Sequence, residues 1–197
     1  MEGHWKKGRL HPTGRKIFID GDLYEGEFSY GRLQGTGKLV YHGKQTYEGE
    51  FSEDKPNGRG REICPDGTEY SGEYFEGHKH GKGKFVWADG SWYEGDFSKG
   101  AIDGQGTYVW GNGRGYTGDW KNNKMHGKGV FKWDDGRYYE GQYHMDKKEG
   151  FGVFVWSNGK RYEGEWKNGL QHGRGKLINS SGKAREGIWE NGKFKKK

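Results

Sequence analysis

A glycine-rich run is the first feature of this sequence whose residue types and spacing could do chemistry. The segment from Gly113 to Gly118, GRGYTG, fits the pattern G-x-G-x-x-G. In dinucleotide-binding proteins this pattern presents backbone amides and a helix N-terminus to a pyrophosphate. Here no helix signal follows the run, and its glycines fall on an internal repeat described below. The run therefore predicts strand and turn structure rather than a phosphate site.

Histidines and the single cysteine are the second group that could do chemistry. His11, His80, His126 and His172 share one place in the repeat. At about 4.8 Å per strand, the last three lie about 19 Å apart, too far to share a metal ion. Cys64 takes a place that is aromatic in most repeats and has no nearby histidine in its repeat, which favours burial over nucleophilic work. We expect no metal, no cofactor and no catalytic residue, and so no enzyme.

Basic residues form the third group, because they gather toward the C-terminal half of the chain. Lysine and arginine outnumber aspartate and glutamate by 34 to 28. Such a basic surface could bind anionic phospholipid or an acidic partner, and a simple solvated lysine-rich surface is the alternative. Nucleic acid is not expected, because glutamate is regularly interleaved and the aromatic residues are needed for packing. The candidates are Arg114, Lys124, Arg137, Lys147, Lys148, Lys160 and Lys183.

An internal repeat supplies the elements that must position these residues. The pattern Tyr-x-Gly-x-aromatic recurs every 23 residues, and we number the repeat from its tyrosine as position 1. Position 3 is glycine and position 5 is aromatic in all nine copies. The repeats cover residues 1–192 as a single domain of about eight and a half units, followed by a basic tail at 193–197. They start at residues 1, 24, 47, 70, 93, 116, 139, 162 and 185.

Alternation with period two predicts two strands in each repeat. Tyr93, Gly95 and Phe97 would share one face, with Glu94 and Asp96 on the other. Glycine after Asp or Asn near position 21 predicts a tight hairpin turn, and positions 6 to 11 predict a longer turn at the opposite edge. On the polar face, acidic residues at positions 2 and 4 are expected to lie near Lys or Arg at position 15, as solubility and register devices.

The composition agrees with an unusual all-β architecture. Only 29% of the residues are hydrophobic and the mean hydropathy is −1.26, yet 16% are aromatic, with 40 glycines and 3 prolines. Such a chain has large rings to bury but few aliphatic side chains for a second layer, and its glycines leave room for the rings. We expect an elongated, single-layer, twisted antiparallel β-meander of stacked hairpins, about 80 Å long.

The repeat unit resembles the membrane occupation and recognition nexus (MORN) repeat. The resemblance rests on sequences such as YEGEWKNG followed by HGRG, which begin at Tyr162, and it covers essentially the whole chain. The departures from the pattern predict local weak points or specialised contacts. They are Met1, Pro12, Glu62, Cys64 and Arg185.

The resemblance implies a non-catalytic scaffold. Proteins made mostly of such repeats are found in cilia, flagella, radial spoke heads and other cytoskeletal structures. We expect a partner helix or extended peptide to bind along a groove of aromatic side chains and glycines, because a monomer rarely exposes so large an apolar face. Pairing of the sheet ends into a homodimer stays open. The predicted groove residues are Tyr70, Tyr74, Trp87, Tyr93, Phe97, Trp110, Tyr116, Trp120, Trp133, Tyr139, Tyr143, Trp156, Tyr162 and Trp166.

A peripheral membrane adaptor is the alternative that the family's name implies, with the basic C-terminal half binding acidic phosphoinositides. Related repeats also occur beside lipid kinase and methyltransferase domains, but this chain has no length left for one. No apolar run reaches the roughly 20 residues of a membrane span, and the N-terminus lacks the apolar stretch of a signal peptide. A cytoplasmic, cytoskeleton-associated protein, in a cilium or flagellum, is expected.

Overall fold

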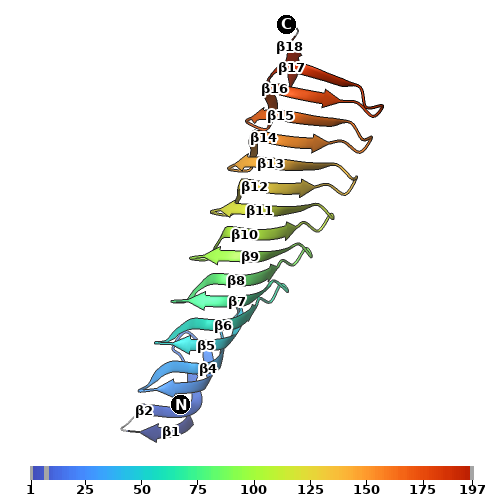
Figure 1. Ribbon diagram of the computed structural model, residues 1–197. Coiled ribbons are helices and arrows are strands. Elements are labelled where there is room, and N and C mark those ends of the chain that lie inside the picture. The colour runs from blue at the N-terminus through green and yellow to red at the C-terminus, as the bar shows by residue number, and fades with distance from the viewer. Residues whose placement is uncertain (1, 7–8, 196–197) are drawn as a thin grey trace. The chain divides into compact units, whose positions relative to one another are not determined.

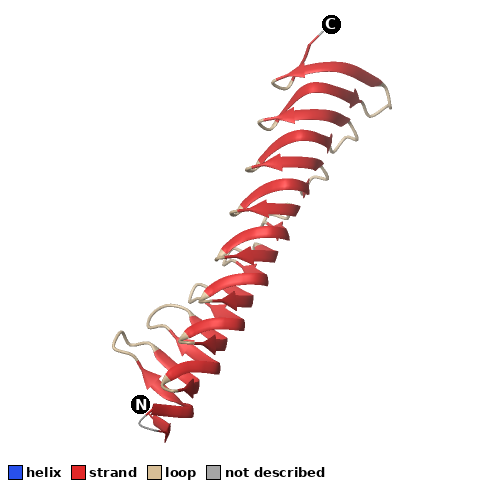
Figure 2. Ribbon diagram, turned by 60° about the vertical axis from the view of Figure 1, so that its left-hand side comes forward, coloured by secondary structure: helices blue, strands red, loops and turns tan. Residues whose placement is uncertain are grey.

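The computed structural model describes residues 2–6 and 9–195, with side chains described from residue 12 onward. The described residues form strands and turns without a helix (Figures 1 and 2), which confirms the predicted all-β meander. None of them therefore belongs to a helix long and apolar enough to cross a membrane. The strands are β1 (Glu2–Lys6), β2 (Arg9–Ile17), β3 (Leu23–Ser29), β4 (Arg32–Val40), β5 (Thr46–Ser52), β6 (Lys55–Ile63), β7 (Glu69–Phe75), β8 (His78–Val86), β9 (Trp92–Ser98), β10 (Ala101–Val109), β11 (Gly115–Lys121), β12 (Lys124–Lys132), β13 (Tyr138–His144), β14 (Lys147–Val155), β15 (Arg161–Lys167), β16 (Leu170–Ile178), β17 (Ala184–Glu190) and β18 (Lys193–Lys195).

The chain divides into two compact units, residues 1–101 and 102–197. Within each unit, every strand pairs antiparallel with its neighbour in the sequence (Figure 1). The segment expected to be a basic tail begins with β18, which pairs with β17. The ring of Phe194 packs edge-on against Trp189 at 4.9 Å, so this segment extends the sheet.

The turns differ from the sequence prediction. Lys121 pairs with Lys124, which leaves Asn122 and Asn123 as a two-residue turn with φ of 47° and 63°. Positive φ at both central residues defines a type I′ turn, whose twist matches that of antiparallel strands. The connection from β12 to β13 is longer, residues 133–137, and holds the Asp-Gly pair. The prediction was therefore wrong about which edge carries the tight turn: positions 7 and 8 form it.

A β-bulge lies opposite position 4 in most hairpins, with its extra residues on the second strand. In the sixth repeat Gly118 pairs with Gly129 and Trp120 pairs with Met125, so Asp119 has no partner in β12, although it still pairs with β10. The backbone N–H of Lys128, across the bulge, donates a hydrogen bond of 2.6 Å to the Asp119 carboxylate. A bulge interrupts ladder hydrogen bonds, and this side chain satisfies one of the freed donors. The acidic residues at position 4 thus cap the bulge, a role that the sequence prediction of surface charge pairs missed.

Charge pairs on the polar face involve position 2 instead. Lys84 at position 15 lies 3.4 Å from Glu94, and Lys176 lies 3.0 Å from Glu186. These side chains are largely exposed, and exposed pairs contribute at most about 1 kcal/mol each. The expected pairing of position 15 with position 2 is confirmed for these two repeats.

Removing a bulge cap should destabilise the protein modestly. Glu50 Oε1 accepts a hydrogen bond of 2.8 Å from the N–H of Arg59. Glu50→Ala should lower the free energy of unfolding by about 1 kcal/mol, because the amide at a fixed bulge loses its acceptor. Glu48→Ala, at exposed position 2 of the same strand, is the matched control and should change it by less than about 0.5 kcal/mol. Equal effects of the two substitutions in urea unfolding would contradict the capping role.

The core is a file of tyrosines that lie flat on glycine. Tyr116 is fully buried, and its hydroxyl donates a bifurcated hydrogen bond to the carbonyl oxygens of Asp119 (3.0 Å) and His126 (3.2 Å). Its ring meets Trp120 and Tyr143 edge-on, at centroid distances of 5.0 and 5.2 Å. Edge-to-face pairs of this kind stabilise beyond their buried area. The same arrangement recurs at Tyr24, Tyr47, Tyr70, Tyr93, Tyr139 and Tyr162, each at most 1% exposed.

Candidate functional site

The predicted groove residues separate into two classes by burial. The rings at positions 1 and 5 are buried, so they form the core and a partner cannot reach them. Only the tryptophans at position 18 keep part of their rings exposed. The buried class comprises Tyr70, Tyr74, Tyr93, Phe97, Tyr116, Trp120, Tyr139, Tyr143, Tyr162 and Trp166, and the half-buried class comprises Trp87, Trp110, Trp133 and Trp156.

Three of the half-buried tryptophans belong to the second unit and form what we call the tryptophan row, Trp110, Trp133 and Trp156. Each stands at the first residue after a strand, where its backbone N–H and carbonyl close the following turn. The ring centroids of Trp110 and Phe131 are 5.3 Å apart, and those of Trp133 and Phe154 are 5.4 Å apart. Rings from successive repeats are therefore in contact. The row is therefore held by turns and by neighbouring rings.

The indole N–H groups distinguish the row from the core tryptophans. In the core, Trp166 donates to the carbonyl of Gly152 at 3.0 Å, and Trp120 donates to that of Gly106 at 3.2 Å. Within residues 12–195, no acceptor lies in hydrogen-bond range of an indole N–H of the tryptophan row. A rigid aromatic surface with free donors is the composition that protein-binding sites favour.

Basic side chains cover the tryptophan row from the same turns. Arg114, Arg137 and Lys160 occupy position 22 and lie over the rings of their own repeats' tryptophans at 5.8, 5.4 and 4.9 Å. A cation over an indole face is attracted by the ring quadrupole. The basic edge and the aromatic face were predicted from the sequence as two separate binding surfaces. In the structure they form one surface.

The remaining predicted basic residues do not form one patch. Lys124, Lys147 and Lys183 are exposed. Lys148 instead lies among aromatic rings, and burial, together with the nearby Arg137, lowers the pKa of its amine to about 8. From the sequence, Lys148 was expected to be one of the solvated lysines. Its repeat position, 10, holds Leu33, Ile102 and Met125 elsewhere, and that apolar pattern was the available signal.

The first unit carries an ion pair where the fourth to seventh repeats carry an aromatic ring. Glu62 replaces an aromatic residue at position 16, and its Oε1 lies 2.7 Å from the amine of Lys79. Beside it, burial and the charge of Glu62 raise the pKa of the Cys64 thiol, which disfavours the thiolate that nucleophilic chemistry needs. The predicted specialised contact at Glu62 is thus a neutralised pair within the aromatic face.

The histidines do not gather. His126 contacts His144 at a ring distance of 5.0 Å, while His80 packs on Phe75 and the Nδ1 atom of His172 is buried. Within residues 12–195, no three His, Cys, Asp or Glu side chains lie together in a way that could hold a metal ion. His11 lies outside the residues whose side chains the structure describes.

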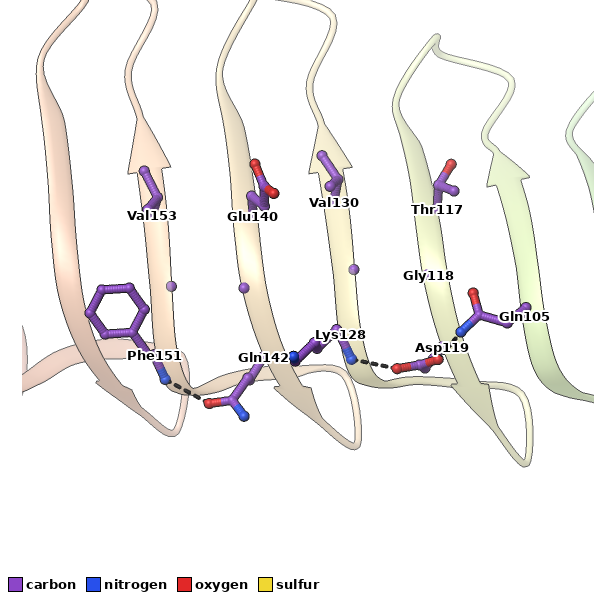
Figure 3. A pocket seen from close by; sticks show the side chains of 13 residues that line it. Gln105, Thr117, Gly118, Asp119, Lys128, Val130, Glu140, Gln142, Phe151 and Val153 are labelled. Carbon is purple, nitrogen blue, oxygen red and sulfur yellow. Dashed lines mark hydrogen bonds between the residues drawn. The ribbon is translucent and has the colours of Figure 1, made fainter.

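A shallow depression on the polar face of the second unit is a further candidate that the sequence did not predict. Figure 3 shows it across β10 to β14, with glycine backbone between rows of side chains. Two of its polar side chains are already used, because Asp119 accepts from the N–H of Lys128 and Gln142 accepts from that of Phe151 (Figure 3). These two side chains therefore already hydrogen-bond to the backbone of the bulges. The tryptophan row is the stronger candidate for a binding site.

The chain is similar to known proteins in its sequence repeat and in its fold. The MORN repeat family model matches residues 2–23, 24–44, 47–69, 70–92, 93–113, 116–136, 139–161 and 162–183. The TCP10 domain of Danio rerio CPAP is similar in structure, with a TM-score of 0.50 and 15% identity, over 90% of this chain and 84% of that chain. The SAS-4 (dCPAP) TCP domain of Drosophila melanogaster, solved in complex with a proline-rich motif of Ana2 (dSTIL), has a TM-score of 0.48 and 11% identity, over 92% and 97%. No curated protein sequence matches the chain.

Proposed function

This chain belongs to the MORN repeat family, and from that premise we propose that it is a non-catalytic scaffold that binds a protein segment on the tryptophan row of its second unit. The observation that carries the proposal is the burial difference: ten predicted aromatic contacts are core, whereas the row stays reachable and its indole donors are free. Tryptophan, tyrosine and arginine dominate the residues that contribute most to protein binding. The row presents tryptophan with a cation stacked on each ring.

The assembly in which the scaffold works is a further part of the proposal. We propose that the bound segment belongs to a ciliary, flagellar or other cytoskeletal assembly, because proteins made mostly of such repeats occur there. A repeat scaffold suits this use, since each hairpin adds a further contact site along one surface.

Trp110→Ala combined with Trp133→Ala should abolish partner recovery from cell extract. Loss of each central tryptophan typically costs about 2 kcal/mol or more of binding free energy, which corresponds to about 30-fold in affinity. The fold should persist, because the tyrosine file stays intact, and circular dichroism checks this. Phe151→Ala is the matched control, because Phe151 is 60% exposed in the same unit but lines the polar-face depression.

The measurement is quantitative mass spectrometry of proteins captured by the tagged wild type and both variants. Proteins lost with the double variant and kept with Phe151→Ala would support the scaffold. Equal recovery on all three would contradict it.

Binding to vesicles that contain phosphoinositide tests the alternative at low salt. The wild type is compared with a variant in which Arg137, Lys160 and Lys183 are reversed to glutamate. Vesicle binding that is lost on charge reversal, without any protein partner, would favour the membrane adaptor instead.

A further inference from the structure

Lys148 places a positive charge inside the aromatic face. It lies on β14, and its amine is 4.4 Å from the ring centroid of Phe154, 4.7 Å from that of Trp166, 5.2 Å from that of Tyr139 and 5.5 Å from that of Trp133. The rings attract the cation, but together they also remove most of its water. An ammonium group in such a site gains from any anion that reaches it.

The side chains that the structure describes supply no such anion. Within residues 12–195, no Asp or Glu side chain forms an ion pair with Lys148. Lys79 holds the same repeat position and shows the contrast, because its amine lies 2.7 Å from Glu62. Glu62 belongs to the repeat before that of Lys79, and the corresponding residue in the repeat before that of Lys148 is Phe131. One lysine is neutralised by its own chain, whereas the other is left with its charge.

A second cation, Arg137, lies near Lys148. Arg137 lies over the ring of Trp133 at 5.4 Å, the same ring that Lys148 approaches, and its charge adds to the lowering of the lysine pKa. Asp135 faces Arg137 and pairs with its guanidinium at 2.7 Å, so that carboxylate is already engaged. The charge at the centre of the tryptophan row is thus complementary to an acidic segment.

We propose that Lys148 anchors a carboxylate side chain of the bound protein segment, an aspartate or glutamate flanked by apolar residues that cover the tryptophan row. This rests on the proposed function and names the chemistry of its partner. Most of the cost of removing water from the ammonium is met when the protein folds, so the main loss of hydration on binding falls on the partner's carboxylate. A preorganised, half-buried cation therefore discriminates strongly between an acid and its amide.

Selection from a library of random twelve-residue peptides, with the full chain as bait at neutral pH, tests the proposal. Some selected peptides should bind the wild type but not the Trp110→Ala and Trp133→Ala double variant. These peptides should contain an acidic residue next to apolar ones. Lys148→Met should weaken a selected peptide at least tenfold, and Lys147→Met, at the exposed neighbouring lysine, should change its affinity less than twofold. Replacing the peptide's Glu by Gln should cost the same tenfold on the wild type and nothing further on Lys148→Met.

The outcomes separate the two proposals. Peptides that need the tryptophans but bind Lys148→Met as tightly as the wild type would overturn the anchor and leave the scaffold standing. Equal losses for Lys147→Met and Lys148→Met would also overturn it, since they would show general charge attraction. Failure to select any peptide that depends on the tryptophan row would count against both proposals. Since Lys148→Met retains the fold's packing, weakened binding cannot be assigned to unfolding once its stability is confirmed.

Discussion

Lys148→Met is expected to stabilise the protein, whereas Lys79→Met is expected to destabilise it, although both lysines hold the same repeat position. Burial lowers the pKa of Lys148 to about 8, so its ammonium form is disfavoured in the folded state. A methionine keeps the apolar stem against the rings and carries no charge. The free energy of unfolding of the Lys148→Met variant at pH 7 should exceed that of the wild type by about 2 kcal/mol. One pKa unit corresponds to about 1.4 kcal/mol, and the partial exposure of the amine reduces the full effect of the shift.

Lys79→Met should lower the free energy of unfolding by about 3 kcal/mol. The side chains of Lys79 and Glu62 are only 20% and 19% exposed, so removing the lysine leaves a carboxylate buried beside the aromatic rings. Breaking a buried pair on one side costs about 3–5 kcal/mol, and the residual exposure reduces this. Lys79→Met combined with Glu62→Leu should recover most of the loss. Urea unfolding measures all variants, and effects of the same sign for the two lysines would contradict the account.

The Lys148 effect should also depend on pH in a defined direction. Between about pH 8 and the usual lysine pKa of about 10.4, the unfolded state binds more protons at this site than the folded state does. The contribution of Lys148 to stability therefore rises with pH across this window, and it is constant below it. The stability advantage of Lys148→Met should shrink as the pH is raised from 8 toward 10. An advantage that does not change with pH would show that its cause is packing rather than charge.

The second large effect concerns a single methyl group. In Gly129→Ala the new Cβ would lie 2.3 Å from the hydroxyl oxygen of Tyr116 and 2.4 Å from the ring carbon that bears it. The ring is fully buried between strands and cannot move aside without breaking its bifurcated hydrogen bond. We expect a loss of about 3 kcal/mol in the free energy of unfolding, at the upper end for an overpacked core.

Gly115→Ala is the matched control for this substitution. Gly115 belongs to the same hairpin, but its Cβ would meet only the Tyr108 carbonyl at 3.5 Å and Val109 at 3.7 Å, which are ordinary contacts. That variant should be neutral or slightly stabilised, because alanine restricts the unfolded chain. Near-ultraviolet circular dichroism and urea unfolding report both. Similar losses for the two alanines would mean that backbone freedom, rather than the space for the tyrosine ring, makes glycine necessary.

Much of the fold could be predicted from the sequence because the same pattern of residues recurs in every repeat. Tyr-x-Gly-x-aromatic at a fixed period of 23 residues, as around Tyr93, indicated hairpins and the aromatic face. The turn lengths were misassigned, because Asp-Gly pairs occur in tight hairpins, although Asn122-Asn123 carries an equally good type I′ signal. The bulge opposite Asp119 was missed, since one acidic residue in an alternating strand looks like an ordinary exposed side chain.

The candidate site could be predicted only in part. Periodicity placed Tyr116 and Trp133 on one face alike, but burial depends on how far each ring reaches over its neighbours' glycines, which spacing alone does not reveal. Lys148 was grouped with exposed lysines because hydropathy assigns every lysine to water. Its environment is set by rings from three other segments of the chain, and only the structure brings them together.

Hydroxyl-radical footprinting of the complex recovered from cell extract is the measurement that tests the central claim most directly. The rate of oxidation is compared between the free protein and the complex, residue by residue. The account predicts protection of Trp110, Trp133 and Trp156, with Phe151 oxidised as fast as in the free protein. Protection of Phe151 with an unchanged tryptophan row would place the partner on the polar face and contradict the account.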